Sequence, residues 1–98
     1  MIRVMIERQC QPGKEAQLKD LLLELRVAAI RQHGYISGET LREAGHPSTF
    51  MVISTWISVE SWKNWQTARP RMLVADMMAA LLTAQEKIRV FTEDHDNV

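Results

Sequence analysis

The stretch TWISVESWKNWQTARPR, residues 55–71, contains all three tryptophans of the chain, and only two phenylalanines and one tyrosine lie elsewhere. Ser58 is placed to cap a helix that has the acidic Glu60 in its first turn, where a negative charge suits the helix dipole. Pro70 interrupts that helix and suits the first turn of another. The stretch therefore predicts the end of a strand followed by two successive helices.

The rest of the chain contains the other predicted strands and helices. Ile2, Val4 and Ile6 alternate with more polar residues, which is typical of a strand with one buried face. The pattern predicts four strands, namely Met1–Gln9, Tyr35–Glu43, Thr49–Trp56 and Lys87–Glu93. It also predicts three helices: Lys14–Gln32, a short one that starts near Ser58, and Arg71–Ala84. Gly34 is expected to be the C′ residue of the first helix. The order β-α-β-β-α(α)-β indicates an α+β, ferredoxin-like fold, with a four-stranded antiparallel sheet and helices on one face. We expect a single domain over residues 1–98, with a polar tail from about residue 94.

The predicted sheet has an uncovered face that would expose apolar side chains. It would carry Met5, Met51 or Phe50, and Phe91, and the helix from Arg71 is apolar nearly all round. A second copy of the chain, packed sheet against sheet, would cover this surface. We therefore expect a homodimer.

Composition excludes several classes of function. Twelve basic residues balance twelve acidic ones, so neither nucleic acid nor an anionic membrane is expected as a partner, and an RNA-binding domain of this topology is disfavoured. Cys10 is the only cysteine, and no run approaches the roughly 20 apolar residues of a membrane span. The N-terminus has no uninterrupted apolar core of a signal peptide, so a cytoplasmic protein is predicted. The histidines are not at metal-ligand spacing and there is no phosphate-binding glycine loop, so no metal or cofactor is expected.

The tryptophans differ in their predicted roles. On a helix from Ser58, Trp62 lies at the centre of the apolar arc and is interpreted as core, as is Trp56. Trp65 lies at the border of that arc, where an indole can both pack and contact a ligand. Asn64 points away from the arc and is expected to be solvated.

A few polar residues are candidates for chemistry. Glu7 lies beside Met5 and would act as a base if their face of the strand lined an enclosed cavity; the alternative is a salt bridge to an arginine. Arg69 and Arg71 would orient an oxyanion, and Tyr35 would line the cavity together with Met5 and Trp65. The alternatives are a solvated or capping role for the two arginines and a packing role for Tyr35.

The run HGYISGETLREAGHPSTFMVISTWISVESWKNW, residues 33–65, resembles the antibiotic biosynthesis monooxygenase family of dimeric α+β barrels. The likeness lies in a glycine and an aromatic residue that open the second strand, a strand that ends in Trp56, and a Ser-x-Glu-Ser helix with a large residue at Trp65. It extends over nearly the whole chain.

The resemblance implies one of two activities. Some members oxidise polycyclic phenols to quinones with molecular oxygen and no metal or flavin. Others degrade haem with an asparagine on strand one, a tryptophan on the second helix and an axial histidine. Trp65 matches that tryptophan, but Glu7 stands at the asparagine position and no histidine lies between His46 and His95, so haem degradation is disfavoured. Many relatives carry histidines where this chain has Trp65 and Arg71.

Two hypotheses follow. The first is a cofactor-independent monooxygenase that acts on a small aromatic or quinol-type substrate, with Glu7 as base, Trp65 as aromatic wall and Arg69 as anion-stabilising group. The second is a non-catalytic dimeric barrel that binds a small apolar ligand.

Overall fold

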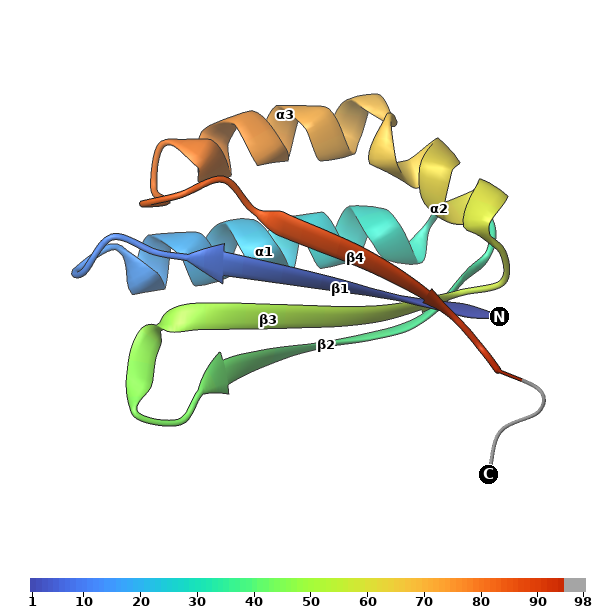
Figure 1. The fold of residues 1–98 in the computed structure, drawn as a ribbon. Coiled ribbons are helices and arrows are strands. Elements are labelled where there is room, and N and C mark those ends of the chain that lie inside the picture. The colour runs from blue at the N-terminus through green and yellow to red at the C-terminus, as the bar shows by residue number, and fades with distance from the viewer. Residues whose placement is uncertain (95–98) are drawn as a thin grey trace.

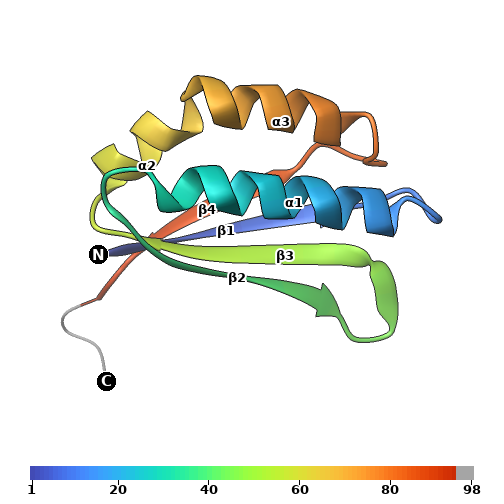
Figure 2. The same ribbon diagram turned by 180° about the vertical axis from the view of Figure 1, so that it is seen from behind.

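The chain forms one antiparallel sheet covered on one face by three helices, as the computed structural model in Figures 1 and 2 shows for residues 1–94. The elements follow in the order β1 (Ile2–Gln9), α1 (Glu15–Ile30), β2 (Tyr35–Glu43), β3 (His46–Trp56), α2 (Val59–Gln66), α3 (Arg69–Ala79) and β4 (Lys87–Thr92). The strands lie in the order β2-β3-β1-β4. The predicted ferredoxin-like α+β fold is thus confirmed.

Strict alternation along β1 separates the two faces of the sheet. Ile2, Val4 and Ile6 are buried beneath the helices, where α1 contributes its apolar stripe, and each is followed by a residue that points to the other face. In β3 the helix-covered positions are Phe50, Val52, Ser54 and Trp56, which pair with even-numbered residues of β1. Phe50 therefore belongs to the core, and of the two alternatives Met51 and Phe50 it is Met51 that faces away from the helices.

Helix α3 ends five residues earlier than predicted, at Ala79 and not Ala84. The residues that follow it bond to the end of β1 instead of continuing the helix. The Gln11 amide donates to the Leu81 carbonyl at 2.9 Å, and the Thr83 amide donates to the Gln9 carbonyl at 2.8 Å. This pairing occupies backbone groups that a longer helix would need for itself.

Gly34 lies at the entrance to β2, beneath the start of α2. Helix α1 already ends at Ile30 with Arg31 as its C-cap, so Gly34 is not the C′ residue that was predicted. Its φ of +87° and the nearby Ser61 side chain, which a Cβ would strike, both require glycine. Its carbonyl accepts a hydrogen bond from the Ile57 amide at 2.8 Å, which ties the start of β2 to the end of β3.

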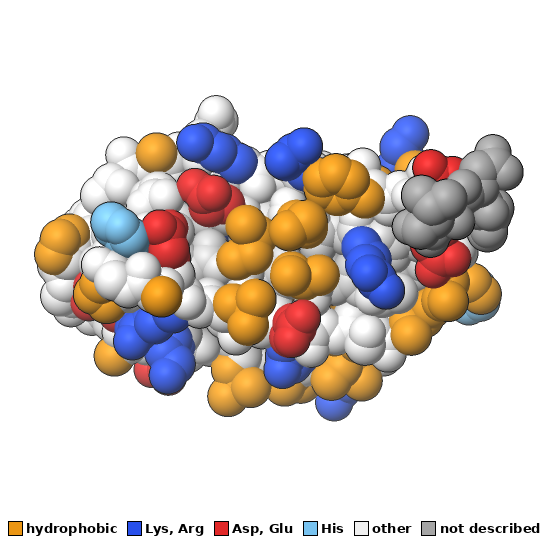
Figure 3. Space-filling model, turned by 60° about the horizontal axis from the view of Figure 1, so that its bottom comes forward, with side chains coloured by type: hydrophobic (Ala, Val, Ile, Leu, Met, Phe, Trp, Pro, Cys, Tyr) orange, Lys and Arg blue, Asp and Glu red, His pale blue; other side chains and the backbone are white. Residues whose placement is uncertain are grey.

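The face of the sheet away from the helices, here called the open face, is apolar at its centre (Figure 3). Met5, Met51 and Ile53 are half-buried there, and Phe91 of β4 is 39% exposed. The surface predicted from the sequence is therefore present, with Met51 in place of Phe50.

Helix α3 is not enclosed on several sides within one chain. Only Arg71 and Met78 are buried along it, while Met72, Leu73 and Met77 are about half exposed. No helix within residues 1–94 has the length and apolarity to cross a membrane. The predicted polar tail lies mostly outside the described residues.

Candidate functional site

A recess lies between the helix-covered face of the sheet and the three helices. It contains a cavity of about 50 Å³, inside a hollow of about 480 Å³ that includes open solvent. Residues from every helix and from three strands line it, namely Ile6, Arg8, Leu22, Leu25, Arg26, Ala29, Tyr35, Gly38, Thr40, Val52, Ser54, Trp56, Trp62, Trp65 and Arg71. A mostly apolar hollow with a few convergent polar groups is the usual form of a small-molecule site.

Aromatic rings build one wall of the recess. Trp56 is completely buried at the end of β3 and contacts the Tyr35 ring edge-on, with centroids 5.3 Å apart. It also stacks on Trp65 at 6.3 Å and meets Trp62 edge-on at 6.0 Å. Its indole Nε1 donates to Ser54 Oγ at 3.0 Å, which fixes the ring against the sheet. The predicted core roles of Trp56 and Trp62 are confirmed, and both also line the recess.

The local sequence of α2 explains how two of these rings reach the recess. Ser58 caps the helix as predicted, because its side-chain oxygen accepts from the Ser61 amide at 3.1 Å. Trp62 and Trp65 are three residues apart and so share one face of the helix, and both are buried. Asn64 points outward and is exposed, as predicted.

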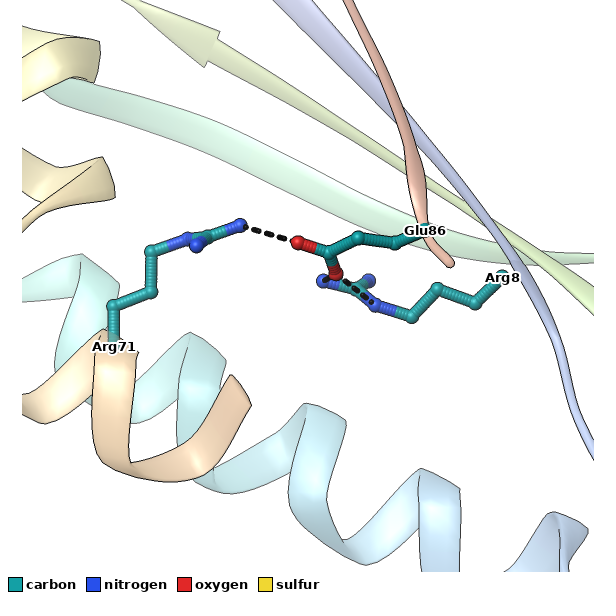
Figure 4. Close-up of polar contacts among 3 residues, drawn as sticks. All are labelled: Arg8, Arg71 and Glu86. Carbon is teal, nitrogen blue, oxygen red and sulfur yellow. Dashed lines mark hydrogen bonds and ion pairs between the residues drawn. The ribbon is translucent and has the colours of Figure 1, made fainter. Parts of the chain in front are cut away.

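Arg8 is the charged residue at the floor of the recess. It continues the inward-facing series of β1, and its side chain is completely buried. Its Nε donates to Glu86 Oε2 at 2.9 Å (Figure 4). Burial lowers the pKa of the Arg8 guanidinium, Glu86 opposes that change, and the neighbouring Arg71 adds to it. Arg8 is thus a cation held in a low-dielectric site by a single carboxylate.

Arg71 approaches the same carboxylate from α3. Its Nη2 donates to Glu86 Oε1 at 3.3 Å, so the two carboxylate oxygens are divided between the two arginines (Figure 4). The Arg71 guanidinium also lies over the Trp62 ring, 5.4 Å from its centroid, in a cation–π contact. Arg26 of α1 is the third arginine that lines the recess.

Each of the three arginines keeps a buried nitrogen without a hydrogen-bond partner among the described residues. These nitrogens are Arg8 Nη1, Arg26 Nη2 and Arg71 Nε. Arg8 Nη2 also lacks hydrogen-bond geometry, although it lies 2.9 Å from Glu86 Oε2 as an ion pair. The recess is therefore rich in unused cationic donors.

The structure divides the residues that the sequence nominated between two faces of the sheet. Trp65 and Tyr35 line the recess. Glu7 and Met5 lie on the open face, where Glu7 Oε2 accepts from Gln9 Nε2 at 2.9 Å. The recess lies on the other face, so the structure does not bring Glu7 and Trp65 into one cavity. Arg69 is exposed at the first residue of α3 and does not line the recess.

Sequence reasoning missed Arg8, Arg26 and Glu86 as site residues. A signal for Arg8 was present, because it occupies the next inward position after Ile2, Val4 and Ile6. Glu86 lies in the segment before β4, and nothing local to it predicts a partner 78 residues away. Within residues 1–94, no three His, Cys, Asp or Glu side chains gather at a distance that would hold a metal ion.

Comparison with known proteins places this architecture in a family. The sequence model described as antibiotic biosynthesis monooxygenase matches residues 1–72. No protein of curated function matches the chain.

Three solved structures share the fold. A conserved protein from Methanosarcina mazei Go1 has a TM-score of 0.90 at 17% identity, with 95% of this chain and 92% of that chain covered. SnoaB, a cofactor-independent oxygenase from Streptomyces nogalater, has a TM-score of 0.83 at 17% identity, covering 96% and 94%. Rv0793 from Mycobacterium tuberculosis has a TM-score of 0.85 at 14% identity, covering 94% and 93%. At these identities the likeness shows the fold alone.

Proposed function

Because this chain belongs to the antibiotic biosynthesis monooxygenase family, we propose that it is a cofactor-independent monooxygenase that oxidises a small aromatic or quinol-type substrate. The reaction takes place in the recess between the sheet and helices of each subunit. The observation that carries the proposal is the aromatic wall of that recess, where Trp56 contacts both Trp65 and Tyr35 beside the cavity. Flat ring faces and edges at this spacing suit a flat aromatic substrate.

The proposed reaction inserts one atom of molecular oxygen into the substrate. A ring C–H ortho or para to a phenolic oxygen becomes a carbonyl, the second oxygen atom leaves as water, and the phenol is oxidised to a quinone. The ionised phenol supplies the electrons. The recess contributes by excluding water and holding the ring, while the positive charge of Arg8 and Arg71 favours the phenolate over the neutral phenol.

The same proposal includes a homodimer formed through the open face. Met5, Met51, Ile53 and Phe91 form an apolar centre there, which a second copy would bury. In such a dimer Glu7 and Met5 lie at the interface, whereas Trp65 and Tyr35 contact the substrate.

Oxygen uptake tests the activity. We expect the purified protein to consume oxygen with at least one member of a panel of hydroquinones, naphthols and anthrones, faster than its Trp65→Ala variant. Asn64→Ala is the matched control, because Asn64 is the exposed neighbour of Trp65 on the same helix. Equal rates for wild type and Trp65→Ala across the whole panel would exclude this function, provided that the variant's circular dichroism shows a folded protein.

One observation favours the alternative of a binding protein without catalytic activity. Among the described residues, those that line the recess include no carboxylate and no imidazole, so they offer no conventional general base. The alternative predicts saturable binding of the same aromatic compounds with no oxygen consumption above the buffer rate. Calorimetry and oxygen uptake on one preparation separate the two functions.

A further inference from the structure

We propose that the recess binds an aromatic anion, a compound whose carboxylate or phenolate oxygen is held by the free guanidinium donors of Arg8, Arg71 and Arg26. This inference rests on the proposed function for the location of the substrate and adds the chemical class of that substrate. It starts from the charge of the site, which the aromatic wall leaves unexplained.

The charges within the recess do not balance. Arg8 is completely buried and the Arg71 side chain is 6% exposed, yet the two share the single carboxylate of Glu86. Arg26, the third arginine of the lining, adds another positive charge. Removing an unpaired cation from water is costly, so a buried excess of positive charge calls for a further negative one. An anionic ligand would supply it.

The hydrogen-bond donors lead to the same conclusion independently of charge. Arg8 Nη1, Arg71 Nε and Arg26 Nη2 are buried without hydrogen-bond partners in residues 1–94, although buried N–H groups are nearly always paired. They come from β1, α3 and α1, and all three side chains line one hollow. Donors that converge from separate elements suit the oxygen atoms of a carboxylate or phenolate.

Glu86 fixes the positions of two of these donors. Its Oε2 accepts from Arg8 Nε at 2.9 Å and its Oε1 accepts from Arg71 Nη2 at 3.3 Å, as Figure 4 shows. The carboxylate thus uses one donor of each guanidinium and orders both side chains before a ligand arrives. Such pre-organisation reduces the entropy that binding would otherwise lose.

The ring of the ligand would lie against the tryptophans. Arg71 connects the two parts of the site, because its guanidinium lies over the Trp62 ring at 5.4 Å while it is also paired with Glu86. The cavity volume of about 50 Å³ favours a small ligand, so single-ring compounds are the appropriate probes.

Isothermal titration calorimetry with two matched pairs of probes tests the inference without any turnover. Benzoate is compared with neutral benzamide, and 4-nitrophenol, whose ionised form is yellow, is compared with 4-nitroanisole, which cannot ionise. We expect at least one anion to bind about tenfold or more tightly than its neutral counterpart, since a charge-assisted hydrogen bond is worth at least that factor. Which of the two anions does so identifies the group as carboxylate or phenolate.

Variants assign the effect to the arginines. Arg8→Met is expected to weaken binding of the preferred anion about tenfold or more, while Arg31→Met, an exposed arginine at the end of α1, changes it by less than about twofold because solvent and salt screen its charge. Arg26→Met is the second variant, since it is expected to bind the anion several-fold more weakly without breaking an internal ion pair among the described residues. If Arg8→Met does not fold, Arg26→Met decides the question.

A substitution of Glu86 distinguishes ligand binding from a purely structural role, because the two roles predict different effects on the affinity for the anion. Glu86→Gln removes the negative charge that competes for the arginines. We expect this electrostatic gain to outweigh the lost ordering of the two side chains, so the variant should bind the anion more tightly than wild type, although the free protein becomes less stable. A purely structural network predicts the loss of stability without the gain in affinity. The inference is overturned if neither anion is preferred over its neutral partner, or if Arg26→Met and Arg31→Met bind alike.

The outcome is distinguishable from that of the proposed function. Preferential anion binding with no oxygen uptake would sustain this site and end the monooxygenase proposal. Oxygen uptake with a naphthol or anthrone, together with equal affinity for each anion and its neutral counterpart, would do the reverse.

Discussion

The indole rings of Trp56 and Trp65 stack with their centroids 6.3 Å apart and their planes 25° from parallel. Trp56 ends β3 and Trp65 lies in the last turn of α2, so the pair joins the sheet to the helix that follows it. Both side chains are almost wholly buried. The contact therefore supports the fold and the wall of the recess together.

Replacing Trp65 with alanine should cost stability as well as activity. A buried tryptophan truncated to alanine loses about 3–5 kcal/mol of unfolding free energy. Asn64→Ala, one residue away and exposed, should change it by less than about 0.5 kcal/mol. Urea denaturation followed by tryptophan fluorescence measures both. A loss below about 1 kcal/mol for Trp65→Ala would show that the stack does not hold α2 in place.

Glu7→Gln should leave oxygen consumption within about twofold of wild type. The Glu7 side chain lies on the open face, with the sheet between it and the recess, and it accepts from Gln9 Nε2 at 2.9 Å. Proton transfer requires hydrogen-bond contact or one bridging water, which this position does not offer. The steady-state rate at several pH values is the measurement. A drop of a hundredfold would instead assign Glu7 the role of base.

Phe91→Asp should weaken self-association by at least about tenfold. Phe91 is 39% exposed on the open face, and burying a phenylalanine side chain contributes roughly 1.5–3 kcal/mol that a charged residue cannot. Sedimentation velocity over a range of concentrations measures the change. Met72→Asp, at an apolar and 53% exposed site on the helix side of the molecule, is the control and should remain dimeric. A monomeric mass for wild type at micromolar concentration would exclude the sheet-to-sheet dimer.

Ser48→Ala should raise the pKa of Glu15. The Ser48 hydroxyl donates to Glu15 Oε2 at 2.6 Å and lowers the pKa of that carboxyl, with the Gly13 amide adding a smaller contribution. A carboxyl whose pKa is lower in the folded state stabilises the fold above its unfolded pKa, and this stabilisation disappears as the pH falls through the folded pKa.

The destabilisation caused by Ser48→Ala should accordingly be present at neutral pH and shrink in acid. A carbon-detected NMR titration of Glu15 and thermal denaturation at neutral and acidic pH check the two halves of this prediction. Equal destabilisation at both pH values would mean that the hydroxyl acts without the charge of Glu15.

Most of the fold follows from local patterns. The bounds of β2 were predicted without error, and those of β1, α1 and β4 differ from the predicted bounds by at most two residues at either end. The predicted end of α3 was wrong because residues 81–83 form backbone hydrogen bonds with the end of β1. Local sequence preferences cannot predict a pairing with a strand some seventy residues earlier. Strand β3 also starts earlier than predicted, at His46 and not at Thr49, because His46 pairs with Glu43 across the turn at Gly45.

The candidate site was predicted less well than the fold. The sequence identified Trp65 and Tyr35, whose aromatic character makes them visible, and the structure places both in the recess. Arg8 was not identified, because an arginine in a strand is normally exposed and only a distant carboxylate makes its burial tolerable.

Glu7 and Arg8 show what each source of information decided. The sequence by itself determined that these neighbours point to opposite faces of β1, because side chains alternate along any strand. Only the tertiary structure decided that the Arg8 side is the one enclosed with the tryptophans and that Glu86 meets it there at 2.9 Å. Alternation is a property of the local backbone, whereas the arginine pair forms only when the helices and the segment before β4 close over one face of the sheet.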